Sequence, residues 1–134
     1  MDKEEELRQW FDIAGKDLTS AEILLNNMHP VPDEIVCFHC QQSVEKYLKG
    51  FMFLHDTIPP KIHDLVQLLN LCVSIQSDFS TLLSKCTFIN RFSVLPRYPN
   101  ELQINDNDVR LALQYAKDIK AFIESQADCS FIAG

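Results

Sequence analysis

Glycine, long apolar runs and strand-like alternation are all scarce in this chain. Its 134 residues include three glycines and six prolines, while apolar residues make up 46% of the total. This composition excludes collagen-like and low-complexity chains and indicates a compact globular protein. No apolar run approaches the roughly 18 residues of a membrane span, and the N-terminal residues are acidic, unlike a secretion signal. We therefore expect one cytoplasmic domain without a membrane segment.

Positive charge is also scarce, because twelve lysines and arginines face nineteen acids and the net charge is −7. Residues 1–33 hold eight acids and three bases, residues 98–134 hold six and three, and residues 34–97 are nearly balanced. Binding to a long nucleic acid depends on neutralising several phosphates, and no dense basic stripe is present to do so. The charge distribution argues against extended nucleic-acid binding but is compatible with a small anion site.

Signals for disulfides and metals are weak. The five cysteines are an odd number without a secretion signal, which indicates reduced thiols. Cys37 and Cys40, with His39 between them, have the spacing of half a zinc site, but no second pair of closely spaced ligands follows. Buried free cysteine is the more common explanation, so we expect no metal and no other cofactor.

Five amphipathic helices and no strands are predicted, because every long apolar pattern has a period near 3.6 residues. Their expected ranges are 4–28, 33–55, 62–75, 78–92 and 107–125. Short connections between long helices favour antiparallel neighbours. The predicted fold is therefore an all-α, up-and-down antiparallel four-helix bundle with a short additional helix. The domain is expected to span residues 1–126, followed by a C-terminal tail over 127–134.

The apolar positions of three helices define the expected core. They are Leu7, Trp10, Ala14, Leu18, Ala21, Leu25 and Met28 in the first helix, Leu65, Leu68, Leu69 and Cys72 in the third, and Val109, Leu113, Ala116, Ile119 and Ile123 in the last. Asp64 lies at the start of the third helix, where a carboxylate favours the positive end of the helix dipole, and Asn105 or Asp106 is suited to cap the last helix. A further apolar run, residues 51–54, predicts an exposed patch.

Asp17 lies beside the apolar seam of the first helix. An unpaired buried carboxylate costs several kcal/mol, so Asp17 needs a partner such as Lys46 or Arg97. Arg97 also has Glu45 as an alternative partner. These alternatives stay open from the sequence.

Polar residues of the second helix form the most informative stretch of the chain. Because His39, Gln42 and Lys46 follow one another at three- and four-residue steps, they line one stripe that could hold a nucleotide base and phosphate. The alternative is a solvated face on which Glu45 and Lys49 form an ordinary i,i+4 pair worth about 0.2–0.5 kcal/mol.

Two arginines and a tyrosine lie in or next to the connection before the last helix. Arg91 and Arg97 could bind phosphate, because the planar guanidinium donates two parallel hydrogen bonds and stays charged. The alternative is structural, with Arg97 in an ion pair and Tyr98 packing its ring against the bundle.

Taken together, three stretches resemble the signature of the HEPN domain family in order and spacing: residues 38–46 (FHCQQSVEK), 63–65 (HDL) and 97–99 (RYP). The opening helix, with Trp10, Ala14, Asp17 and residues 21–25 (AEILL), is similar to the first HEPN helix. The resemblance covers roughly residues 8–125. It implies a helical bundle and a homodimer.

The resemblance also implies a function. Similar HEPN proteins accompany a separately encoded minimal nucleotidyltransferase, bind nucleotide or present substrate to it, and in some pairs act as toxin and antitoxin. On this reading the expected ligand-binding residues are His39, Gln42, Lys46, Lys49, Arg91, Arg97 and Tyr98.

Catalytic HEPN proteins are metal-independent ribonucleases in which an arginine is followed four to six residues later by a histidine. Here the residue five positions after Arg91 is Pro96, and no histidine follows. Without it there is no evident general base near neutral pH, so no catalytic residue is assigned. The alternatives are a ribonuclease with a substitute base and an inert homodimeric interaction module.

Overall fold

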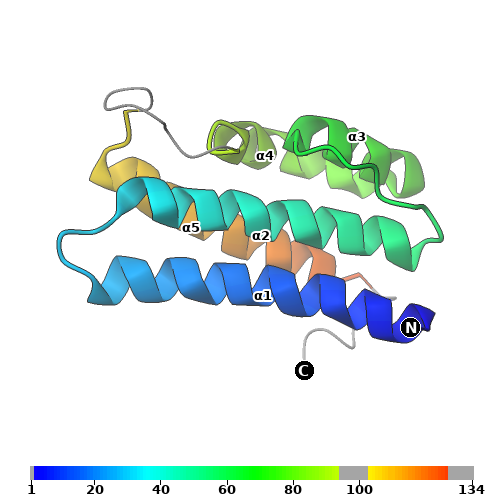
Figure 1. Cartoon of the computed structure of the whole chain (residues 1–134). Coiled ribbons are helices and arrows are strands. Elements are labelled where there is room, and N and C mark those ends of the chain that lie inside the picture. Colours follow the sequence, from blue (N-terminus) through cyan, green and yellow to red (C-terminus); the bar gives the residue numbers. More distant parts are fainter. Residues whose placement is uncertain (1, 94–102, 127–134) are drawn as a thin grey trace.

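Five α-helices and one 3₁₀ segment make up the structure, a computed structural model that describes residues 2–93 and 103–126 (Figure 1). They are α1 (Lys3–Asn27), α2 (Asp33–Leu54), α3 (Leu65–Ile75), the 3₁₀ segment η1 (Ser77–Leu82), α4 (Leu83–Asn90) and α5 (Asp106–Glu124). No strand occurs in these described ranges, so the all-helical prediction is confirmed there.

The predicted fourth helix is divided into η1 and the shorter α4. Residues 77–81 include three hydroxyl side chains and an aspartate, which compete with the backbone for hydrogen bonds. The Thr81 hydroxyl donates to the Asp78 carbonyl oxygen at 2.9 Å. The tighter 3₁₀ turn is typical of such a connection.

The helices α2 and α3 run in the same direction, so the predicted up-and-down order does not hold for this pair. The His63 carbonyl, just before α3, accepts from Gln41 in the first half of α2 at 3.0 Å. Cys72, near the end of α3, contacts the Leu48 carbonyl farther along α2, with Sγ 3.6 Å from the oxygen. The connection over residues 55–64 therefore returns along α2 before α3 begins (Figure 1).

The central element is α2, with α1 on one side, α3 and α4 on the other, and α5 behind (Figure 1). Thirteen of its 22 residues are buried, and four of these are polar or charged: Gln41, Ser43, Glu45 and Lys49. Buried polar groups need hydrogen-bond partners. The surroundings of α2 must therefore supply them.

The predicted core is confirmed for α3 and α5, whose predicted apolar residues are all buried. In the first helix only four of the seven predicted positions are buried, since Trp10 and Leu25 are half-buried and Met28 is 51% exposed. Phe11 is buried instead, because it packs against Tyr47 of α2, with ring centroids 6.1 Å apart.

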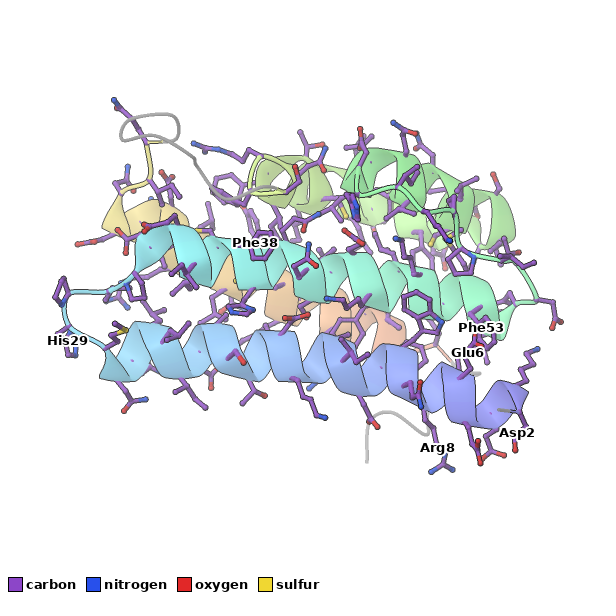
Figure 2. The ribbon with its side chains drawn as sticks, in the orientation of Figure 1. Asp2, Glu6, Arg8, His29, Phe38 and Phe53 are labelled. Atoms are coloured by element: carbon purple, nitrogen blue, oxygen red, sulfur yellow. The ribbon has the colours of Figure 1, made fainter. Side chains whose placement is uncertain are left out.

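The exposed patch predicted for residues 51–54 is also wrong. Phe51 and Met52 are fully buried, and Phe53 and Leu54 are half-buried. Figure 2 shows Phe53 at the end of α2 near the first part of α1. The run faces inward because α2 is covered by neighbouring helices on several sides, so two adjacent faces of this helix lie in the core.

Of the two N-cap candidates for the last helix, the structure confirms Asn105, and Asp64 caps α3, which begins at Leu65 and not near residue 62 as predicted. The Asp64 carboxylate accepts from the amides of Val66 and Gln67 at 2.9 and 3.2 Å and begins α3. Asn105 accepts from the Asp108 amide at 2.8 Å, and Asp108 accepts in return from the Asn105 amide, which is a capping box.

Four of the cysteines, Cys37, Cys40, Cys72 and Cys86, are buried free thiols as predicted, and Cys129 lies outside the described residues. Burial raises the pKa of Cys37 to about 12, which keeps it as an unreactive thiol. In residues 2–93 and 103–126 no group of three His, Cys, Asp or Glu side chains is placed to hold a metal. None of the described helices is both long and apolar enough to cross a membrane.

Candidate functional site

A first group of charged side chains joins α1 to α2. The Asp17 carboxylate accepts from Lys46 Nζ at 2.7 Å and lies 3.0 Å from Nδ1 of His39. The side chains of Asp17, Lys46 and His39 are 15%, 22% and 29% exposed. We call these three residues the Asp17 cluster. Of the two partners considered for Asp17, the structure shows Lys46, and Arg97 lies outside the described residues.

A second group lies on the opposite edge of α2, where the chain enters α3. Glu45 accepts from Lys49 Nζ at 3.0 Å, and both carboxylate oxygens lie 3.1 Å from Nδ1 of His63. The Glu45 and Lys49 side chains are only 5% and 8% exposed, whereas that of His63 is 70% exposed. In this Glu45 cluster a buried ion pair therefore supports an exposed imidazole.

Two glutamines connect the clusters around α2. Lys46 Nζ donates to Gln42 Oε1 at 3.2 Å, and Gln42 Nε2 donates to Gln41 Oε1 at 2.8 Å. Gln41 Nε2 then donates to the His63 carbonyl at 3.0 Å and lies 3.4 Å from Glu45 Oε1. A continuous polar network thus runs from α1 across α2 to the start of α3. Within the described residues, every buried side-chain nitrogen and oxygen has a hydrogen-bond partner.

Close packing of α1 on α2 holds the Asp17 cluster together. The Ser43 hydroxyl donates to the Ala14 carbonyl oxygen at 2.8 Å. A Cβ added at Gly50 would lie 2.7 Å from Cε1 of Phe11, so only glycine permits this approach. The short distance between the helices brings Asp17 within reach of Lys46.

The end of α4 fixes the Glu45 cluster from the other side. Asn90 Oδ1 accepts from the Leu65 amide at 2.8 Å, and Asn90 Nδ2 donates to the Asp64 carboxylate at 3.2 Å. The Gln67 backbone amide, which donates to Asp64, is the main cause that lowers the pKa of this carboxyl below its usual value. The residues directly after His63 are therefore held in place.

Arg91 follows Asn90 directly at the end of α4. Its guanidinium carbon lies 5.5 and 5.1 Å from the ring centroids of Phe88 and Phe92, and Nη2 is 3.4 Å from the Gln103 carbonyl oxygen. Of the seven predicted ligand-binding residues, the structure gathers His39, Gln42 and Lys46, and it places Lys49 and Arg91 elsewhere. Arg97 and Tyr98 lie outside the described residues.

A comparison with protein families finds that the HEPN domain profile matches residues 7–126. The chain belongs to the HEPN family. This HEPN chain is also similar to the crystal structure of TT1696 from Thermus thermophilus, with a TM-score of 0.69 and 24% sequence identity. That similarity covers 88% of this chain and 95% of the other, and it shows the fold. No curated protein matches the chain.

Sequence reasoning does not select Gln41 and His63 as site residues of this HEPN domain. Gln41, Glu45 and Lys49 repeat at four-residue steps beside buried positions, which is a signal for a polar stripe within the core. The local pattern around His63 indicates only a helix start. Its contact with Glu45 joins positions 18 apart in the chain, which no local pattern predicts.

A groove of about 480 Å³ between α1 and α5 is a second candidate site in the HEPN domain. It is lined by Leu18, Thr19, Glu22, Ile23, Lys117, Lys120, Ala121 and Glu124. Its charged side chains pair with one another, Glu22 with Lys117 and Lys120 with Glu124. The network around α2, with its open lysine and imidazole, is the stronger candidate.

Proposed function

We propose that this HEPN domain binds a nucleotide at the Asp17 cluster and acts as the partner or substrate-presenting subunit of a minimal nucleotidyltransferase, in a toxin–antitoxin-like pair. The observation that carries the proposal is the convergence of His39, Gln42 and Lys46 at the junction of α1 and α2, where the lysine side chain is 22% exposed. Membership of the HEPN family supports it.

The lysine is suited to a phosphate group. An ammonium has three N–H donors, and Asp17 and Gln42 accept two of those of Lys46. The third is then available to a phosphate oxygen. His39 is 29% exposed and adds a ring nitrogen at the same place.

The other expected ligand residues take different parts in the proposal. Lys49 neutralises the buried Glu45 and so supports the network from inside. Arg91, at the end of α4, belongs to a second contact region for the nucleotide or the partner subunit, and a homodimer presents two such regions. Arg97 and Tyr98 lie outside the described residues and remain expected ligand residues.

Isothermal titration calorimetry with ATP and AMP tests the nucleotide part. Lys46→Ala should weaken binding by about tenfold or more, since a hydrogen bond to a charged group contributes about 1.5–3 kcal/mol. The matched control is Lys16→Ala, which removes an exposed lysine from α1 and should leave affinity within about twofold. Equal affinity of both variants, or no binding by the native chain, would contradict the proposal.

Affinity purification from the native cell lysate tests the partner part. Recovery of a small nucleotidyltransferase in stoichiometric amount is the expected result. Recovery of the HEPN protein alone would contradict the partner role and leave nucleotide binding as a separate property. Metal-free cleavage of RNA by the purified protein, lost in Arg91→Ala, would instead favour the ribonuclease alternative.

A further inference from the structure

The imidazole of His63 is held more firmly than its exposure suggests. The ring Nδ1 lies 3.1 Å from both carboxylate oxygens of Glu45, and the backbone carbonyl of His63 accepts a hydrogen bond from Gln41 at 3.0 Å. The next residue, Asp64, is fixed as the cap of α3. Ordering a side chain that is 70% exposed costs conformational entropy, so this arrangement is unusual for a surface histidine.

The buried ion pair determines which ring nitrogen of His63 carries the proton. Glu45 is paired with the Lys49 ammonium at 3.0 Å, and an ionised carboxylate can only accept hydrogen bonds. In the neutral ring the proton is therefore on Nδ1, which donates to Glu45. Nε2 is left with its lone pair and, on a 70% exposed side chain, is accessible from solvent.

The unprotonated Nε2 of His63, in the connection before α3, and the Lys46 ammonium of α2 lie at two edges of α2. Gln42 and Gln41 connect the Lys46 ammonium to the backbone carbonyl of His63, through hydrogen bonds of 3.2, 2.8 and 3.0 Å. A ligand whose phosphate binds Lys46 and which extends over Gln42 therefore approaches His63. In a nucleotide the ribose is next to the phosphate, and its hydroxyls are the nearest hydrogen-bond donors.

We propose that Nε2 of His63 accepts a hydrogen bond from a ribose hydroxyl of the bound nucleotide, with Glu45 as the positioning residue. This inference rests on the proposed function, because it requires a nucleotide phosphate at Lys46. A site with a fixed acceptor rejects an analogue that lacks the hydroxyl, since the acceptor then loses its partner. His63 is thereby a specificity-determining residue for ribonucleotides.

Calorimetric titrations with ATP, 2′-deoxy-ATP and 3′-deoxy-ATP test the assignment. The native chain should bind ATP about tenfold more tightly than at least one deoxy analogue. In His63→Ala the affinities for ATP and the deoxy analogue should become about equal, because ATP loses affinity and the deoxy analogue does not. The control is His29→Ala, an exposed histidine in the connection between α1 and α2 (Figure 2), which should keep the preference.

Each alternative outcome has a defined meaning. A preference that is unchanged in His63→Ala, or a native chain that binds all three nucleotides equally, would overturn this inference while nucleotide binding stands. A preference that instead follows the 6-amino group, measured with inosine triphosphate, would overturn the hydroxyl assignment. The absence of any ATP binding would overturn the proposed function and this inference together.

The role of Glu45 needs a separate variant, because Glu45→Gln alone would leave the Lys49 charge buried. The double variant Glu45→Gln/Lys49→Met removes both charges and keeps similar volumes. The glutamine amide can donate to Nδ1, so the ring is free to adopt the other tautomer. The ribose preference should be lost while ATP still binds through Lys46, and a retained preference would overturn the positioning role.

Discussion

The Asp17 and Glu45 clusters contain the same three residue types, a carboxylate, a histidine and a lysine, yet they differ in what they expose. In the Asp17 cluster all three side chains are between 15% and 29% exposed. In the Glu45 cluster the ion pair is 5% and 8% exposed, whereas the histidine is 70% exposed. Burial therefore makes the lysine the accessible group in one cluster and the imidazole the accessible group in the other.

The largest expected effect is on stability, in the Glu45 cluster. Glu45→Ala leaves the Lys49 charge buried without its partner, which typically costs about 3–5 kcal/mol. Urea unfolding followed by circular dichroism measures the loss in the free energy of unfolding. Replacing both residues, as in Glu45→Gln/Lys49→Met, should recover much of this loss because no unpaired charge remains.

Asp17→Ala provides the direct comparison. Lys46 and His39 are partly exposed and can be hydrated, so the loss should be about 1–2 kcal/mol, smaller than for Glu45→Ala. The same urea titration gives this value. Equal losses for the two variants would remove the distinction between the clusters.

Substitutions at Gly50 and Gly15 test the packing between α1 and α2 without changing any charge. Gly50→Ala should destabilise the protein by about 1–3 kcal/mol, because the new Cβ would lie 2.7 Å from the Phe11 ring. Gly15→Ala is the control: its nearest contact is the Tyr47 hydroxyl at 3.6 Å, and alanine should stabilise α1 by about 0.5–1 kcal/mol. Thermal unfolding of both variants would show opposite shifts, and a neutral Gly50→Ala would mean that α1 can move away.

Local signals in the sequence are sufficient for several features. Asp64 and Asn105 begin helices because their short side chains reach nearby backbone amides. The need of Asp17 for a cationic partner follows from the cost of a buried charge, but the choice of Lys46 over Arg97 does not. The core positions of α5 follow from one apolar stripe on a helix that is otherwise polar.

Features that depend on tertiary packing cannot be predicted in this way. The direction of α3 is set by contacts such as that of Gln41 with the His63 carbonyl. The length of the connection over 55–64 is compatible with α3 running either antiparallel or parallel to α2. The burial of Lys49 likewise follows from α2 being covered on several sides, whereas its i,i+4 spacing from Glu45 is equally compatible with a solvated pair.

The smallest effect concerns pH, at the cap next to the Glu45 cluster. The Gln67 amide lowers the pKa of Asp64 in the folded state, so this carboxylate stabilises the fold above its ordinary pKa of 3.8. That contribution is lost as the pH falls through the folded-state pKa. Asp64→Asn should cost a few tenths of a kcal/mol at pH 7, and the difference from the native chain should shrink near pH 3. Urea titrations at both pH values measure it, and a difference that grows with acid would contradict the cap's role.

The tautomer of His63 tests most directly the claim that the buried pair defines an exposed acceptor. Long-range ¹H–¹⁵N correlation spectra of uniformly labelled protein distinguish protonated from bare ring nitrogens. The structure predicts a neutral His63 ring protonated on Nδ1 and bare on Nε2, and loss of this preference in Glu45→Gln/Lys49→Met. A neutral ring protonated on Nε2 in the native chain would contradict the account.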